Sequence, residues 1–469
     1  MRFTPGATMA SRLYSIYGAF SLFSSVAFAA SLTGSRLLVV LEDTEQKASY
    51  SQFFGDLEAR GYELKFESPK SEGLSLFAHG EREYDNLILF PPKSKGYGPA
   101  LTPQLLLQFA NQEGNILILT SPKGTPEQTR EFARELDINL PPKDYLVVDH
   151  FSHDTLSTEK HDMVIVKRPE VSTSTQNYFS PSSSSTEDII AYRGVGHTLG
   201  NGPLLNPILT AGRTSYAYDT IDDSVYAEDP WSAGSQLHLV SALQARNNAR
   251  ITISGSAEIF SDVFYGLNVK PPGSAKKVKV ANRAFGRDVT AWTFKETGVV
   301  KVVGIKHYLT NETDAQINPS LYRIKNDVTF EIELAEYKSD HWAPFTVPAN
   351  DALQLEFTML DPYHRISLTP SVFSSNSTTY STSFRIPDQH GVFAFRVNYK
   401  RPFVTNVDEK YTVTVRHFAH DEYTRSWDIS GAWVWMAGIA VTVVGWVAFC
   451  ALWLWSAPAT EVKKGKKSQ

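Results

Sequence analysis

The sequence predicts an α/β domain, an all-β domain and one C-terminal transmembrane helix, in this order. Over residues 36–150 short apolar strands alternate with amphipathic helices, the pattern of a parallel sheet covered on both faces. After Pro271 and Pro272 the chain changes to strand after strand, as in an antiparallel β-sandwich. An unbroken apolar run over 433–455 is long enough to cross a bilayer. We expect a Rossmann/flavodoxin-like domain, an immunoglobulin-like β-sandwich and a membrane span.

The first domain is predicted to comprise residues 31–268. Its strands are expected at short apolar segments, 36–41, 63–66, 86–90, 115–120, 163–166 and 250–254. Helices are expected at 50–60, 103–113, 126–136, 237–245 and 256–264. Thr102 precedes Pro103 and is predicted to cap the second of these helices, and Ser256 to cap the last. A serine-rich loop over 171–188 interrupts the pattern.

The second domain is predicted to comprise residues 269–428 and to lie directly before the membrane. One helix, at about 289–296, connects the two patterns. Period-two alternation and turn clusters then predict strands at 299–309, 328–337, 353–360, 383–386, 392–399 and 411–418.

The predicted transmembrane helix covers residues 429–456 and has tryptophans near both ends, as interfacial aromatic belts require. The alternative is a buried core helix of a soluble protein. Lysines follow the span in residues 457–469, so the positive-inside rule predicts a cytosolic tail. Gly431, Gly438 and Gly445 recur every seven residues and could let another helix approach closely; frequent glycine in membrane helices is the alternative explanation.

Residues 1–30 are predicted to be a secretory signal peptide. An apolar stretch at 13–28 follows Arg2 and Arg12, and small residues place the cleavage site near Ala29 or Ala30. A second membrane anchor is the alternative. With the signal removed, the protein is expected to be a type I membrane protein whose translocated body includes two glycosylation sequons, at Asn311 and Asn376.

Composition excludes some classes of function. The net charge is −5 and the pI about 6.2, so there is no basic field for a nucleic acid. Cys450, inside the predicted span, is the only cysteine, so no disulfide is expected. Glu42, Asp43 and Glu45 follow the first strand, where a dinucleotide site needs glycines, and would repel phosphate. Gly194, Gly196 and Gly200 have the wrong spacing for such a site and are interpreted as turn glycines.

One group of residues resembles a metal site: Asp149, His150, His153, Asp154, His161 and Asp162. Two histidines with a carboxylate could hold zinc, and an open coordination position would suggest hydrolysis. The group lacks the helical i, i+4 spacing, and solvated loop histidines are common, so a structural role is favoured. We predict no metal, cofactor or catalytic residue in this chain. A Gly-x-Ser-x-Gly motif around Ser256 is also absent.

Several segments, in the same order along the chain, resemble the family of 48-kDa single-span (beta) subunits of oligosaccharyltransferase. The most specific is ALQARNNARITISGSAEIFSD at 242–262. Others are 62–66, 84–90, 147–154, 192–197, 292–298, 353–362 and 384–399, so the resemblance covers about residues 36–411 and continues into the span.

The resemblance implies a non-catalytic accessory subunit of the endoplasmic reticulum complex that transfers a lipid-linked oligosaccharide from dolichyl diphosphate to asparagine. It implies as partners the catalytic subunit, a ribophorin II-type subunit and small membrane subunits. A divalent metal is expected in the catalytic subunit only. Lys466 and Lys467 match the family's di-lysine pattern for retrieval to the endoplasmic reticulum. The alternatives are a luminal glycan or cargo receptor, and a metal-dependent hydrolase that uses the His150 group.

Overall fold

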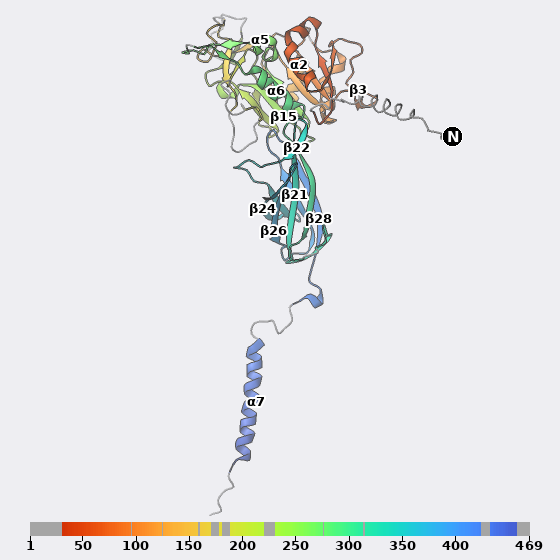
Figure 1. Ribbon diagram of the computed structural model, residues 1–469, viewed down its shortest axis with the longest axis vertical. Coiled ribbons are helices and arrows are strands. Elements are labelled where there is room, and N and C mark those ends of the chain that lie inside the picture. The colour runs from red at the N-terminus through yellow and green to blue at the C-terminus, as the bar shows by residue number, and fades with distance from the viewer. Residues whose placement is uncertain are drawn as a thin grey trace, which may run out of the picture.

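The computed structural model describes residues 31–94, 96–123, 125–157, 160–169, 178–180, 188–219, 230–274, 276–312, 315–423 and 432–456. The predicted signal peptide, most of the serine-rich loop, Gly431 and the two tail lysines Lys466 and Lys467 lie outside these ranges. Figure 1 shows the first domain, the second domain and the C-terminal helix following one another along the long axis.

A seven-stranded mixed sheet forms the centre of the first domain. Its order is β12-β15-β16-β6-β5-β1-β2. The strands are β1 (Arg36–Val40), β2 (Glu63–Glu67), β5 (Asn86–Leu89), β6 (Asn115–Leu119), β12 (Leu205–Thr210), β15 (His238–Gln244) and β16 (Arg250–Ser254). The five strands from β2 to β16 are parallel to one another, whereas β15 pairs antiparallel with both β16 and β12. The expected parallel sheet is therefore confirmed for five strands.

Helices cover both faces of this sheet, as predicted. They are α2 (Ser51–Ala59), α3 (Pro103–Asn111), α4 (Glu127–Glu135), α5 (Asp262–Tyr265) and α6 (Asn282–Thr293). Alternate strand residues enter two separate cores: Leu37 and Val39 pack with α2 and α6, and Leu38 and Val40 with α3 and α4. The hydroxyl of Thr102 accepts a hydrogen bond from the Leu105 amide at 3.4 Å, which confirms the predicted cap.

Three of the predicted helices differ in the structure. The segment 237–245 is strand β15, because it pairs with β12 and β16 and is buried on both faces, which removes the polar alternation of a half-exposed strand. Ser256 is not a helix cap; its hydroxyl donates to the Arg193 carbonyl, and Ser261 caps α5. The helix predicted at 289–296 spans 282–293 instead, and its Phe285 and Val289 belong to the first domain's core, beyond the boundary at 268 suggested by the pattern.

Short strands and 3-10 helices complete the first domain. The strands are β3 (Phe77–Ala78), β4 (Glu81–Arg82), β7 (Ile138–Asn139), β8 (Tyr145–Val148), β9 (Val164–Lys167), β10 (Ile189–Tyr192), β11 (Thr198–Leu199), β13 (Tyr216–Asp219), β14 (Ser232–Ala233), β17 (Asn268–Val269) and β18 (Val278–Lys279). The 3-10 helices are η1 (Thr44–Tyr50), η2 (Pro99–Leu101), η3 (Gly234–Gln236) and η4 (Glu258–Phe260).

Two five-stranded sheets form the second domain around one core. The first has the order β19-β21-β26-β25 with β22 paired to β21, and the second has the order β20-β28-β27-β23-β24. Their strands are β19 (Val299–Leu309), β20 (Leu321–Arg323), β21 (Asp327–Lys338), β22 (His341–Pro344), β23 (Gln354–Thr358), β24 (Pro362–Ser367), β25 (Thr369–Phe373), β26 (Thr378–Arg385), β27 (Gly391–Tyr399) and β28 (Val407–Arg416). Phe330 and Ile332 of one sheet share a core with Phe357 and Phe395 of the other. Pairing is antiparallel except between β20 and β28.

The C-terminal helix α7 (Ala432–Leu454) follows η5 (His420–Glu422). Among the residues that the structure describes, it is the one helix long and apolar enough to cross a membrane. None of its side chains is buried against the rest of the protein. The lack of protein contact along an apolar helix is consistent with a lipid environment and not with a core helix.

Candidate functional site

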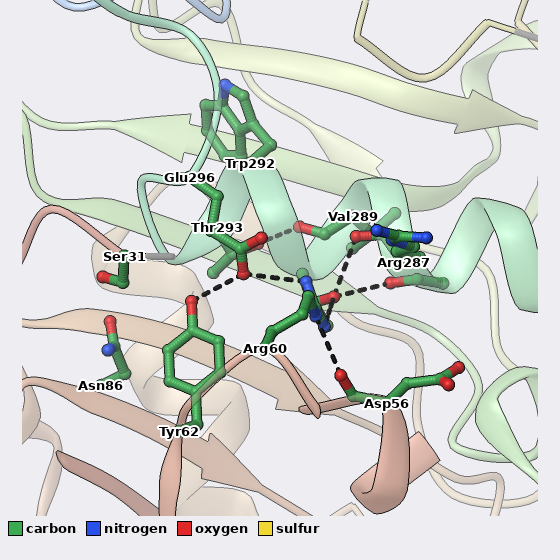
Figure 2. A network of polar contacts seen from close by, with 12 residues as sticks. Ser31, Asp56, Arg60, Tyr62, Asn86, Arg287, Val289, Trp292, Thr293 and Glu296 are labelled. Carbon is green, nitrogen blue, oxygen red and sulfur yellow. Dashed lines mark hydrogen bonds and ion pairs between the residues drawn. The ribbon is translucent and has the colours of Figure 1, made fainter. Parts of the chain in front are cut away.

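The first site-like feature is a buried polar network at the end of α6 (Figure 2). Glu296 is 2% exposed, and its carboxylate accepts hydrogen bonds from Nη1 of Arg60 at 2.8 Å and from the Tyr62 hydroxyl at 2.7 Å. Arg60 also donates to the hydroxyl of Thr290 at 2.8 Å and to the Asp56 carbonyl. Burial, together with Glu296, raises the pKa of Tyr62 well above its ordinary value. The network joins α2, the start of β2 and α6.

Arg250, at the start of β16, holds the chain where it passes between the domains. Its guanidinium is fully buried and donates to the carbonyls of Trp292, Thr297 and Gly298 at 2.6–2.7 Å. The guanidinium also lies 4.7 Å from the Trp292 ring centre. Burial lowers the pKa of Arg250 to about 9. Three charge-assisted hydrogen bonds in a dry environment fix residues 292–298 firmly.

Further hydrogen bonds connect the two domains directly. The Trp292 indole donates to the Phe403 carbonyl at 2.8 Å, and the Gln244 amide donates to the Val404 carbonyl at 2.8 Å. The Tyr178 hydroxyl donates to Glu336 at 2.8 Å. We call these contacts, with those of Arg250, the domain junction. Because its partners are largely buried, the junction holds the two domains in one relative orientation.

A groove of about 1400 Å³ lies beside the junction. The first domain contributes residues of β12 and β15, and the second contributes β19 and the segment 400–409. Leu205 and Arg246 line it from the first domain, and Val302 and Asn406 line it from the second. Its walls come from both domains, so its shape depends on the junction.

A second hollow, of about 700 Å³, lies at the carboxyl ends of the parallel strands. The hollow lies where the strand order reverses, because β2 is next to β1 on one side and β5 is next to β1 on the other. Such a point is the usual place of a ligand site in open α/β sheets. Lys93, Lys123 and Arg193 line it together with Asp144, Asp162 and Glu258, so its charges are balanced. Asp43 accepts a hydrogen bond from the Glu45 amide after β1, the place that a phosphate would take.

The histidine group is held by contacts of its own. His150 Nδ1 lies 2.6 Å from His161 Nδ1 and its Nε2 lies 2.9 Å from the Tyr216 hydroxyl, while the His153 and His161 rings stack at 3.8 Å. Burial, and then His161, lowers the pKa of His153.

The nearby carboxylates face other partners. Asp149 accepts from the amides of Phe151 and Ser152 and from the hydroxyls of Thr214 and Ser215. Asp154 accepts from the amides of Leu156 and Lys270. In the described part of the chain, no three His, Cys, Asp or Glu side chains form a group that could hold a metal ion.

The glycines at 194, 196 and 200 serve close packing and not the turns that the sequence suggested. A Cβ on Gly194 would lie 2.5 Å from the Gly255 carbonyl, and one on Gly255 would lie 1.8 Å from the Val195 carbonyl. A Cβ on Gly196 would likewise clash with the Leu237 side chain, and one on Gly200 would clash with the Asp137 carboxylate. Gly194 and Gly255 therefore let two backbone segments touch, whereas Gly196 and Gly200 leave room for a neighbouring side chain.

The remaining predicted sites lie apart from one another. Asn311 and Asn376 are both exposed on the second domain, and the Asn311 amide donates to Asp327 at 3.3 Å. Gly438 and Gly445 are on α7, and a Cβ on either would meet open space. The junction was missed by sequence reasoning; the signal was a charged residue, Arg250, at the start of an otherwise uncharged buried strand.

Comparison with known proteins identifies similar chains over almost the whole length. Residues 28–296 match the model of the OST48 N-terminal domain, and residues 307–457 match that of the OST48 middle domain. The chain is 34% identical to the dolichyl-diphosphooligosaccharide–protein glycosyltransferase subunit wbp1 of Schizosaccharomyces pombe, over 95% of this chain and 99% of that one. It is 31% identical to subunit WBP1 of Saccharomyces cerevisiae, over 92% and 93% of the two chains. It is 30% identical to the 48 kDa subunit of Arabidopsis thaliana, over 90% and 93%.

Proposed function

Because the chain belongs to the OST48 family, we propose that it is the luminal scaffold of an oligosaccharyltransferase. It is an accessory subunit of this N-glycosylation complex and is not catalytic by itself. The junction is the observation that supports a scaffold role. A protein that positions other subunits must keep a fixed shape, and Arg250 and Trp292 connect the two domains through buried hydrogen bonds.

The proposed site of action is the endoplasmic reticulum membrane. Residues 1–30 act as a signal peptide, the two domains are luminal, and α7 crosses the bilayer with residues 457–469 in the cytosol. The length and apolarity of α7 support the span, and Lys466 and Lys467 then serve as the retrieval signal. In this topology Asn311 and Asn376 are accessible to glycosylation.

The proposed partners are the catalytic subunit, a ribophorin II-type subunit and small membrane subunits. The catalytic subunit supplies the divalent metal, and this chain supplies no cofactor. We also assign the first domain to the Rossmann/flavodoxin-like folds, since β2, β1, β5 and β6 follow that order. We assign the second to the immunoglobulin-like folds, since two sheets share one core. No finding favours the receptor or the hydrolase.

Purification of the tagged full chain in mild detergent tests the scaffold proposal. The wild type is expected to recover partner subunits and glycosyltransferase activity. Arg250→Met should recover less of both, while Arg246→Met, an exposed arginine nearby, should match the wild type. Recovery of neither partners nor activity with the wild type would overturn the proposal. If Arg250→Met loosens the junction but recovers partners in full, the rigid junction is not needed for assembly.

A further inference from the structure

Four apolar side chains are exposed together at one end of the second domain. Leu360 is 94% exposed and Val392 62%, and Met359 and Tyr363 are 38% and 42% exposed. Met359 and Leu360 lie in the turn between β23 and β24, Tyr363 is near the start of β24, and Val392 is near the start of β27. A Cβ on Gly391 would lie 2.9 Å from the sulfur of Met359, so the two segments touch. We call these four residues the apolar tip.

The apolar tip lies at the end of the domain from which the chain continues to α7. Val392 pairs with Thr414, two residues before β28 ends at Arg416. The opposite end of the domain faces the first domain, because the Ser339 amide donates to the Glu296 carbonyl at 2.9 Å. Figure 1 accordingly shows the second domain between the first domain and α7.

The chain length keeps the apolar tip near the membrane that α7 crosses. Eight residues separate Tyr423 from Ala432, which extend to about 30 Å at most. A tether of this length gives the tip a high local concentration at the bilayer surface. Burial of apolar side chains away from water is favourable, so a few exposed apolar side chains are enough for contact when the domain is already tethered.

The charged residues at this end of the domain suit a contact with lipid that does not rely on attraction between opposite charges. Lys325 lies 2.9 Å from Asp388, and Arg416 lies 2.8 Å from Glu422, so these two pairs of charges neutralise one another. Asp361, in the turn itself, is exposed, and its charge does not attract an uncharged lipid surface. Leu360 lies in the turn between β23 and β24 and is almost fully exposed, so its side chain protrudes into its surroundings. Tyr363, an aromatic ring with a polar hydroxyl, suits the boundary between headgroups and acyl chains.

We propose that the apolar tip inserts into the interface of the bilayer that α7 spans, which gives the second domain a second membrane contact. The contact would limit the tilt of both domains, since the junction fixes one to the other. The proposal depends on α7 crossing the bilayer, but not on the identity of any partner subunit.

Spin labelling of the full chain in phosphatidylcholine nanodiscs tests the proposal. The background variant Cys450→Ser removes the only cysteine, and Leu360→Cys then receives a nitroxide. Its collision rate is measured with oxygen, which enters lipid, and with a water-soluble nickel chelate. The matched control is Asp340→Cys, whose side chain is 83% exposed at the opposite end of the domain. A circular dichroism melt confirms that each variant is folded.

The nitroxide at 360 is expected to show at least a threefold lower nickel accessibility than the one at 340, and a higher oxygen accessibility. Adding Met359→Ser and Val392→Ser should raise the nickel accessibility at 360 toward the control. Equal nickel accessibility at 360 and 340 would overturn the proposal. Protection at 360 that appears only after partner subunits are added would also overturn it, because the tip would then be a protein contact. Co-purification of partners is a separate measurement, so the two proposals can fail independently.

Discussion

The Glu296 carboxylate lies 2.8 Å from Nη1 of Arg60, and the two side chains are 3% and 10% exposed. Both charges are thus removed from water, and each is compensated by the opposite charge of its partner. Removal of one partner from such a pair costs about 3–5 kcal/mol, whereas replacement of both by apolar groups is often neutral.

Glu296→Leu is therefore expected to destabilise the protein by about 3–5 kcal/mol, and Arg60→Leu with Glu296→Leu by clearly less. Urea unfolding of the purified chain measures both. Asp408→Asn is the control, because its pair with Arg396 is 38% exposed on both sides and should contribute less than about 1 kcal/mol. A double variant as unstable as the single one would show that the Tyr62 hydrogen bond, and not the buried ion pair, dominates.

Arg250→Met should uncouple the two domains. The methionine stem fills part of the space, but three buried carbonyls lose charge-assisted hydrogen bonds, at a cost of about 3–5 kcal/mol. Differential scanning calorimetry should show one transition for the wild type and two for the variant, the first at lower temperature. Arg246→Met, four residues earlier and exposed, should keep the single transition. An unsplit transition in Arg250→Met would mean that the remaining junction contacts suffice.

The parts of the fold that the sequence predicted are those set by local pattern. The apolar strands β1, β5 and β6, the Thr102 cap and α7 follow from residue order alone. Strand β15 was mistaken for a helix because a strand buried on both faces has no alternation. The junction was invisible because Gln244 and Val404, 160 residues apart, meet only in the folded chain. The sequence indicated the histidine group and the aspartates beside it. It did not indicate the hydroxyls and backbone amides that donate hydrogen bonds to Asp149.

Gly255→Ala should be strongly destabilising, since its Cβ would lie 1.8 Å from the Val195 carbonyl and backbone cannot move aside cheaply. A loss of about 3 kcal/mol or more is expected, at or above the upper end of the typical range for overpacking. Gly55→Ala is the matched control, because it lies inside α2 with open space around its Cβ. This control should stabilise the protein by about 0.5–1 kcal/mol. Thermal melts that rank the two variants in the reverse order would contradict the packing role of Gly255.

Two buried histidines, one in each of the two domains, should make the protein less stable in acid. Burial, and then His238, lowers the pKa of His197 to about 3, and burial lowers that of His307 to about 4. The folded state thus binds fewer protons than the unfolded state below pH 6.5. Stability is complete above about pH 6.5 and falls as the pH decreases toward the folded pKa, by about 1.4 kcal/mol per pH unit for each histidine.

His197→Gln can keep the hydrogen bond to Ser241 but cannot titrate, so it should flatten the pH dependence between pH 6 and about 4. Urea unfolding at a series of pH values measures the slope. His420→Gln replaces an exposed histidine and should leave the slope unchanged. An unchanged slope in His197→Gln would place the acid sensitivity elsewhere.

On α7, Gly438 and Gly445 lie on one face with Thr442, whose hydroxyl donates to the Gly438 carbonyl at 2.9 Å. Without a Cβ, both glycines leave the helix surface open to close approach by a neighbouring helix. Gly438→Leu with Gly445→Leu should therefore reduce co-purification of the proposed small membrane subunits several-fold in mild detergent. Ala440→Leu with Val447→Leu adds leucines on the opposite face of the helix and should leave recovery unchanged. Equal recovery with both pairs would assign the glycines to lipid contact, and equal loss would show that any bulk on α7 disturbs assembly.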